Sequence, residues 1–308
     1  MSAPVVTAPT PVPNGHIDAA TLRNATLDIP AWPADNVQGP SGALRFRDGE
    51  VVLDEQQVPS GQPPHAAVIL ILSVTYGDVD GDGSDETIAV VGCLIEGGAK
   101  QVIAFDRDAS GKIVTLGRIT GTTGTVRDIR DDSPRVARDG LVTVRVGDYQ
   151  RCCADRTPQI WQKRGYRWRN GAFEQVSGPT RMPAGTHVTE TRLTTSGVKL
   201  TTGDDGYRYG TLSVQVEHLW GAHPEKLALS FGLPAGVERS GSGWPAVTKA
   251  GDGFTVTVDG PPAGATATYR FAFRQRNVTT PGELTVDESA SPLISEAIPW
   301  NNTVTAKF

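Results

Sequence analysis

Apolar side chains recur at every second position along much of this chain, the spacing that places them on one face of a β-strand. In the run Leu141–Val146, three valines share one face and polar residues occupy the other. Short runs rich in β-branched residues, bounded by turn-forming residues, predict further strands at Val68–Val74, Thr87–Leu94, Gln101–Phe105, Ile113–Ile119 and Tyr166–Arg169. The pattern predicts an antiparallel meander in the first half of the chain.

Two turn sequences support this interpretation. Asp106–Gly111 connects two of the predicted strands, and Asn170-Gly171 separates two alternating runs, where Asn-Gly is a strong hairpin signal. One short helix is expected at Asp18–Leu27, with Asp18 as its N-cap and Pro30 beyond its end. The first half is therefore predicted to be almost entirely β-structured.

Alternation is cleaner in the second half, after a Gly/Pro-rich linker at 177–185. Its strands are predicted at Leu212–Val216, Leu227–Leu233, Phe254–Val258, Ala267–Phe273, Leu284–Val286 and Val304–Ala306. Roughly seven strands in a segment of this length are typical of an immunoglobulin-like β-sandwich. The predicted organisation is all-β: a Pro-rich linker at 1–13, a meander domain at 14–180 and an Ig-like sandwich at 185–308.

Composition excludes two classes of protein. The chain has 29 Lys and Arg against 34 Asp and Glu, so it lacks the basic excess that binding to nucleic-acid phosphates requires. It contains no apolar run of about 18 residues, so no membrane span is expected. The 35 glycines and 22 prolines agree with many short strands joined by turns.

The start of the chain bears on localisation. Residues 1–13 are rich in Pro, Thr and Ala, a composition that favours extended tethers. We expect that a signal or membrane anchor precedes Met1 in the natural protein, which would then be secreted or anchored at the cell surface. The alternative is a cytoplasmic start with an irregular tail.

Three cysteines are present: Cys93, Cys152 and Cys153. A bridge between adjacent cysteines is strained and rare, so the expected disulfide joins Cys93 to one of the other two, and the sequence does not say which. A disulfide would fit an oxidising compartment, and buried cytoplasmic thiols are the alternative. Zinc is disfavoured because no histidine or fourth cysteine lies at ligand spacing.

The segment from Asp78 to Glu86, DVDGDGSDE, is the sharpest chemical signal. Alternating carboxylates around glycines let a tight loop wrap oxygen ligands around a hard cation such as Ca²⁺. The predicted ligands are the side chains of Asp78, Asp80, Asp82 and Glu86 with the backbone carbonyl of Ser84. The expected role of the ion is structural. The alternative is a solvated Asp/Gly turn that binds no metal.

An EF-hand is disfavoured, because Ala89 occupies the closing position and the flanking segments are strand-like. The loop instead resembles the calcium loop of FG-GAP and VCBS-type repeats, D-x-D-x-D-G-x-x-[DE] between two antiparallel strands. Those proteins repeat the motif around a propeller, whereas it occurs once here. The resemblance therefore implies a calcium hairpin and no propeller.

Two further resemblances concern whole domains. Ile298–Ala306, IPWNNTVTA, and the turn Pro234–Val237 after a Leu-rich strand are similar to CARDB-like bacterial Ig-fold surface repeats. Such modules are mostly spacers and adhesion or assembly domains. Gly77–Glu86, Gln101–Leu116 and the Cys152-Cys153 pair resemble uncharacterised secreted proteins of GC-rich Gram-positive bacteria, which imply no particular function.

Catalysis is not expected, because no nucleophile elbow, zinc motif, P-loop or dinucleotide fingerprint is present. His218 and His223 are interpreted as exposed loop residues. The basic segment Arg151–Arg169 is interpreted as a solvated strand face, with Tyr166 and Trp168 inward, and the alternative is a patch for an anionic partner.

The sequence therefore predicts a non-enzymatic, calcium-stabilised binding or scaffold protein outside the cytoplasm, whose partner is a protein or a cell-envelope polymer. The alternatives are the sensor domain of a membrane-anchored regulator, a subunit of a larger hetero-assembly and, less favoured, a hydrolase.

Overall fold

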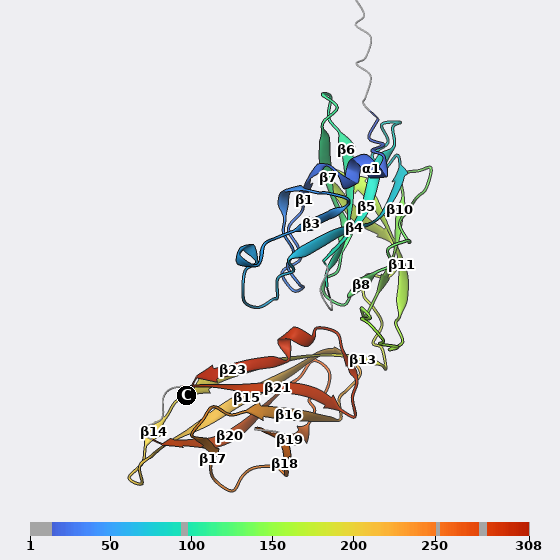
Figure 1. The fold of residues 1–308 in the computed structure, drawn as a ribbon. Helices are drawn as coiled ribbons and strands as arrows, with labels where there is room; N and C mark the ends of the chain where they lie inside the picture. Colours follow the sequence, from blue (N-terminus) through green and yellow to red (C-terminus); the bar gives the residue numbers. More distant parts are fainter. Residues whose placement is uncertain (1–13, 94–97, 251–252, 277–281, 308) are drawn as a thin grey trace, which may run out of the picture. The chain divides into compact units, whose positions relative to one another are not determined.

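The structure is a computed structural model that describes residues 14–93, 98–250, 253–276 and 282–307. The fold is all-β with several antiparallel sheets, as predicted. The described residues form two compact units: unit 1 contains those up to Gln150 together with Trp161–Met182, and unit 2 contains Arg151–Ile160 and those from Pro183 onward (Figure 1). The chain thus passes from unit 1 into unit 2 at Arg151 and returns to unit 1 at Trp161, which the sequence pattern did not indicate.

The start of unit 1 differs from the prediction. Helix α1 spans only Ala19–Arg23, capped by Asp18, whose carboxylate accepts a hydrogen bond from the backbone N–H of Thr21 at 2.9 Å. The residues expected to extend the helix form strand β1 (Thr26–Ile29), which pairs antiparallel with β2 (Gly42–Arg45). Alternation explains the difference. Every second residue of β1 is buried, namely Leu27 and Ile29, and a strand places residues two apart on the same face.

The main sheet of unit 1 has five antiparallel strands whose spatial order follows the chain. They are β3 (Glu50–Val52), β4 (Val68–Gly77), β5 (Glu86–Cys93), β6 (Lys100–Arg107) and β7 (Ile113–Gly121). A 3₁₀ turn, η1 (Glu55–Gln57), lies between β3 and β4. The central strand β5 is buried from its first residue through Gly92. A side chain at the start of β5 is therefore withdrawn from solvent.

A second antiparallel sheet completes unit 1. It contains β8 (Asp128–Ile129), β9 (Arg135–Val136), β10 (Val142–Gly147), β11 (Trp161–Arg169) and β12 (Ala172–Ser177). The predicted hairpin between β11 and β12 is present, with Asn170 at φ 53° and Gly171 at φ 81°, the left-handed conformation that Asn-Gly adopts most readily.

Unit 2 has a six-stranded and a five-stranded sheet. The first contains β13 (Val188–Val198), β14 (Thr201–Thr202), β15 (Tyr207–Gly221), β17 (Val237–Arg239), β20 (Thr266–Arg276) and β22 (Ser295–Glu296). The second contains β16 (Lys226–Gly232), β18 (Val247–Ala250), β19 (Gly253–Asp259), β21 (Glu283–Ser291) and β23 (Thr303–Lys307). A 3₁₀ turn, η2 (Pro299–Asn301), precedes β23.

Both sheets of unit 2 contribute to one hydrophobic core, so this unit is sandwich-like. Phe231 is 2% exposed and lies at the centre of an aromatic group with Phe254, Phe271, Phe273 and Trp244. Phe231 and Phe254 come from the five-stranded sheet and Phe271 and Phe273 from the six-stranded sheet, so the aromatic group ties the two layers together.

The predicted Cys93 disulfide is absent: all three cysteines lie in the part of the chain that the structure describes, and none forms a disulfide. Cys93 belongs to unit 1, where its sulfur packs so closely on Gly39 that a Cβ there would lie 2.9 Å from it. Cys152 and Cys153 belong to unit 2.

No helix within the described ranges is long and apolar enough to cross a membrane.

Candidate metal centre

The acidic loop lies between β4 and β5, as the sequence predicts, and its carboxylates fold back onto the loop backbone. Asp78 accepts hydrogen bonds from the N–H groups of Gly81 at 2.7 Å and Gly83 at 3.1 Å. Asp80 accepts one from the N–H of Asp82 at 3.1 Å. Gly81 and Gly83 have φ values of 86° and 90°, which only glycine adopts without strain. The glycines therefore allow the chain to wind around its own carboxylates.

Glu86 is the deepest residue of the site. It opens β5 opposite Gly77 and is 0% exposed. One carboxylate oxygen, Oε2, accepts a hydrogen bond from the N–H of Val79 at 2.7 Å. The other, Oε1, is buried and has no hydrogen-bond partner among the residues described. A buried carboxylate oxygen without a donor is costly, and a cation would relieve that cost.

Three of the predicted ligands converge. Asp78, Asp80 and Glu86 each offer one oxygen, and these three oxygens lie within 4.8 Å of one another. Asp82 lies in the same loop outside this trio and accepts a hydrogen bond from the N–H of Ser84 at 2.7 Å. Ligation by Asp82 and by the Ser84 carbonyl remains a prediction.

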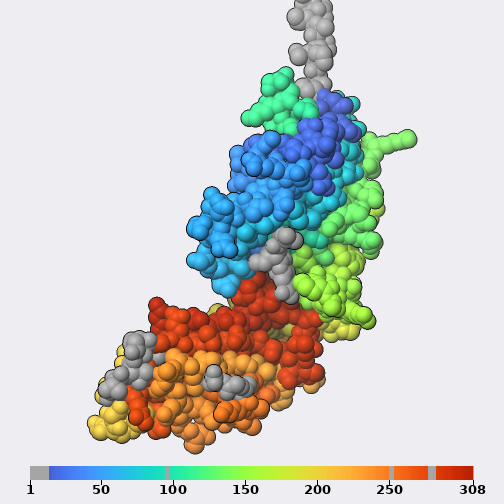
Figure 2. All heavy atoms as spheres, in the orientation of Figure 1, coloured from blue at the N-terminus to red at the C-terminus, as the bar shows by residue number. Residues whose placement is uncertain are grey.

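Asp106 on β6 is a further acidic residue of the site that the sequence reasoning missed. Its Oδ1 is buried and has no hydrogen-bond partner within the described residues. A Cβ at Gly15 would lie 2.3 Å from this atom and 2.9 Å from the backbone oxygen of Asp85, so glycine lets the chain pass close to both. Because Thr87 pairs with Phe105, Asp106 lies beside the start of β5. The pairing of β5 with β6 was the signal that could have identified Asp106 as a site residue. The sequence analysis instead placed Asp106 in the turn between β6 and β7, which projects from unit 1 in Figure 2.

The carboxylates perturb one another's ionisation. Burial, together with the charges of Asp80, Asp106 and Asp82, raises the pKa of Glu86 to about 7, although the hydrogen bond from Val79 opposes the shift. Burial also raises the pKa of Asp80 and of Asp106, and neighbouring carboxylates add to both shifts. Like charges held close in a buried site disfavour ionisation, and a bound divalent cation would reverse that preference.

A pocket of about 320 Å³ opens beside this loop. Asp78 and Asp80 line one part, and Arg138, Arg167 and Trp168 line another. Arg167 is held by an ion pair with Asp139, and the Trp168 ring lies 4.9 Å from that of Phe173. The pocket therefore has acidic, basic and aromatic side chains in its lining, next to the cluster formed by Asp78, Asp80 and Glu86.

Two other sequence interpretations need correction. His218 is not exposed: it is 0% exposed, and its two ring nitrogens face the carbonyl oxygens of Trp220 at 3.0 Å and Pro261 at 3.3 Å. The reason is that His218 continues the inward-facing alternation of β15. Burial lowers its pKa. His223 is exposed, as expected.

The basic segment is not one solvated face. Arg151–Ile160 belongs to unit 2, whereas the remainder forms β11 in unit 1. Tyr166 is buried as predicted, but Arg164 is buried as well, at 6% exposure, with its guanidinium near Gln162 and the Met182 sulfur. The buried Arg164 therefore does not belong to a solvated face of β11, whereas Arg169 is exposed as predicted.

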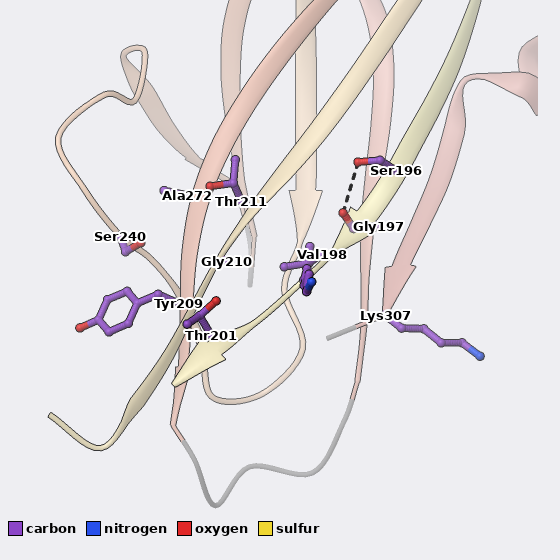
Figure 3. Close-up of a pocket in the computed structure, with 11 residues that line it drawn as sticks. Ser196, Gly197, Val198, Thr201, Tyr209, Gly210, Thr211, Ser240, Ala272 and Lys307 are labelled. Atoms are coloured by element: carbon purple, nitrogen blue, oxygen red, sulfur yellow. Dashed lines mark hydrogen bonds between the residues drawn. The ribbon is translucent and has the colours of Figure 1, made fainter. Parts of the chain in front are cut away.

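Unit 2 has a larger, open pocket of about 850 Å³ (Figure 3). Its polar side chains include Ser196, Thr201, Tyr209, Ser240 and Lys307, and its lining contains no histidine, cysteine or carboxylate residue among those described. Figure 3 shows the ends of Tyr209 and Lys307 pointing away from each other.

No protein-family model matches this chain, and no curated protein sequence matches it significantly.

Proposed function

We propose that this chain is a calcium-stabilised, non-enzymatic binding or scaffold protein that works outside the cytoplasm, with a protein or cell-envelope polymer as its partner. The observation that carries the proposal is the convergence of Asp78, Asp80 and Glu86, in which the fully buried Glu86 keeps one oxygen without a hydrogen-bond donor. A turn that served only to connect two strands would have no need to bury a carboxylate among carboxylates.

The donor set favours Ca²⁺ over transition metals. All the candidate ligands are oxygen atoms, and neither histidine nor cysteine belongs to the group. Asp78, Asp80 and Glu86 would hold the ion, with Asp82, the Ser84 carbonyl and Asp106 as further oxygen sources. The ion would neutralise this acidic group and fix the connection between β4 and β5, which is a structural role.

The proposed location outside the cytoplasm agrees with the same chemistry. Extracellular calcium modules bind with dissociation constants of about 10⁻⁴–10⁻³ M, which only calcium levels outside the cytoplasm satisfy. We propose that this site belongs to that weak class. An extracellular or cell-surface protein would keep the site filled, and a cytoplasmic one would not.

We further propose that unit 1 is an antiparallel meander domain and unit 2 an Ig-like sandwich. The chain-order sheet β3–β7 supports an antiparallel meander in unit 1, and the two sheets around one core in unit 2 support an Ig-like sandwich, the fold implied by the sequence resemblance to CARDB-like repeats. Unit 2 would then be a spacer or docking module. Unit 1 would carry recognition, with the pocket beside the acidic loop as the surface where a partner meets the calcium site.

The test is a thermal melt of the full chain in excess calcium and in chelator. At a calcium concentration 100 times the dissociation constant, binding adds about 2.7 kcal/mol, which raises the melting temperature of unit 1 by roughly 5–10 °C. Asp80→Asn should lose this response. Asp85→Asn, which removes the same charge from an exposed residue of the same loop, should keep it. Equal responses in both variants, or none in the native chain, would refute the proposal.

A further inference from the structure

Two adjacent thiols lie unusually close together in unit 2. The sulfur atoms of Cys152 and Cys153 are 2.7 Å apart. Non-bonded carbon atoms pack at about 3.5–4 Å, and sulfur is larger than carbon, so this separation is far inside an ordinary contact. A disulfide bond is about 2.05 Å long. The backbone therefore already brings the two sulfur atoms most of the way to bonding distance.

The local backbone holds the pair in this arrangement. Cys153 is exposed and has a φ of 54°, a left-handed conformation that non-glycine residues rarely adopt. A turn follows, in which the N–H of Asp155 donates to the carbonyl of Cys152 at 3.0 Å. A left-handed conformation beside two closely spaced sulfur atoms points to a constraint beyond chain connection.

Hydrogen bonds on both sides of the pair fix the segment. The Arg151 guanidinium donates to the carbonyl of Thr157 at 2.6 Å, which closes the loop around the cysteines. The Thr157 hydroxyl lies 2.5 Å from that of Ser295, so the loop is anchored to the body of unit 2. The two thiols are therefore presented by a structured loop.

Cys93 is a poor competitor for this chemistry. Its sulfur packs on Gly39 in unit 1, and burial raises the pKa of its thiol to about 12. The thiolate is the reactive form of cysteine, so such a thiol reacts slowly. Of the three cysteines, Cys93 is therefore the one that we expect to remain unbridged.

We propose that Cys152 and Cys153 are a reversible oxidation site that closes to a vicinal disulfide with disulfide-type oxidants. The Cys153 thiol loses its proton, and its sulfur attacks one sulfur of the oxidant, which breaks the oxidant's S–S bond and releases a thiolate. Cys152 then loses its proton and attacks the Cys153 sulfur, which releases the second thiolate. Two protons and two electrons leave the protein, and the oxidant becomes two thiols.

The bond would be easy to reduce. Adjacent Cα atoms are 3.8 Å apart across a trans peptide, below the usual range of 4.4–6.8 Å for bridged cysteines. Strained, exposed disulfides are the labile ones, so the site would respond to the redox state around the protein. This proposal does not depend on calcium binding.

Trypsin makes the test direct, because it cleaves after Arg151 and Arg156 and releases Cys152–Arg156 as a short peptide, separate from Cys93. The full chain is reduced, freed of reductant, incubated with oxidised glutathione and alkylated under denaturing conditions. It is then digested with trypsin, and the peptide masses are measured by mass spectrometry. The expected result is a peptide that carries no alkyl group and lacks two hydrogen atoms relative to its reduced form, with Cys93 alkylated. Cys93→Ala should leave this peptide unchanged, and Cys153→Ser should abolish it.

Three outcomes would overturn the inference. Covalent linkage of the peptide that contains Cys93 to this peptide would show that the bridge spans the two units instead. A dimer on a non-reducing gel that Cys153→Ser removes would show an intermolecular bridge. Full alkylation of both cysteines after oxidised glutathione would show that the pair does not close.

Discussion

The substitution Glu86→Gln should stabilise the protein when calcium is absent and destabilise it when calcium is bound. Glutamine keeps an oxygen that can accept the hydrogen bond from the Val79 N–H, and it nearly keeps the side-chain volume. It removes the negative charge that burial and the surrounding carboxylates oppose. In chelator the variant should therefore be more stable than the native chain, and in calcium less stable.

The magnitude follows from the pKa of Glu86, which rises from about 4.5 to about 7 in the folded chain. Because the folded pKa is raised, the residue's contribution is fully present below about pH 4.5 and is lost as the pH rises through about 7. At 1.36 kcal/mol per pKa unit, ionised Glu86 costs the metal-free protein roughly 3 kcal/mol above pH 7. Glutamine should recover much of this at pH 8.

The assay is urea unfolding at pH 8, in chelator and in excess calcium, for the native chain, Glu86→Gln and Asp85→Asn. Asp85 is exposed and should change little in either condition. Unfolding midpoints should place Glu86→Gln above the native chain in chelator and below it in calcium. If Glu86→Gln is equally destabilising in both conditions, the residue is only a structural hydrogen-bond acceptor and the electrostatic reasoning is wrong.

Three further predictions concern the rest of the molecule. Asp106→Asn should lower calcium affinity in a calorimetric titration, whereas Asp108→Asn, at the β6–β7 turn, should not. Phe231→Ala should lower the free energy of unfolding of unit 2 by about 3–5 kcal/mol in urea, because Phe231 is almost fully buried among four aromatic rings. It should leave the calcium response intact. A smaller loss of unfolding free energy would mean that the core relaxes into the cavity. Burial raises the pKa of Glu288 above 4.5, so its stabilising contribution is present below about pH 4.5 and is lost as the pH rises through the raised pKa. Glu288→Gln should make the decline in melting temperature above pH 4.5 shallower, and an unchanged slope would contradict this.

Strand alternation in the sequence predicted much of the fold because burial on one face is a local pattern. β10 and β15 were found in this way. The Thr-rich β13 escaped, since its apolar residues do not alternate cleanly. The helix at Asp18 was extended too far because the residues of β1 also suit a helix end, and only pairing with β2 decides between the two.

The candidate site divides along the same line. Asp78, Asp80 and Glu86 lie close in sequence, so spacing alone was enough to bring them together as candidates. Asp106 reaches the site through the register between β5 and β6, which single-sequence reasoning does not fix. The cysteines show a different limit: a general preference against bridges between neighbours led to Cys93, whereas the structure contains no disulfide among the described cysteines and places the sulfur atoms of Cys152 and Cys153 2.7 Å apart.

A calorimetric titration of calcium into chelator-treated protein at neutral pH tests the central claim most directly. The account predicts one saturable binding event per chain that Asp80→Asn abolishes and Asp85→Asn preserves. Absence of binding to the native chain, or binding that Asp80→Asn leaves unchanged, would contradict it.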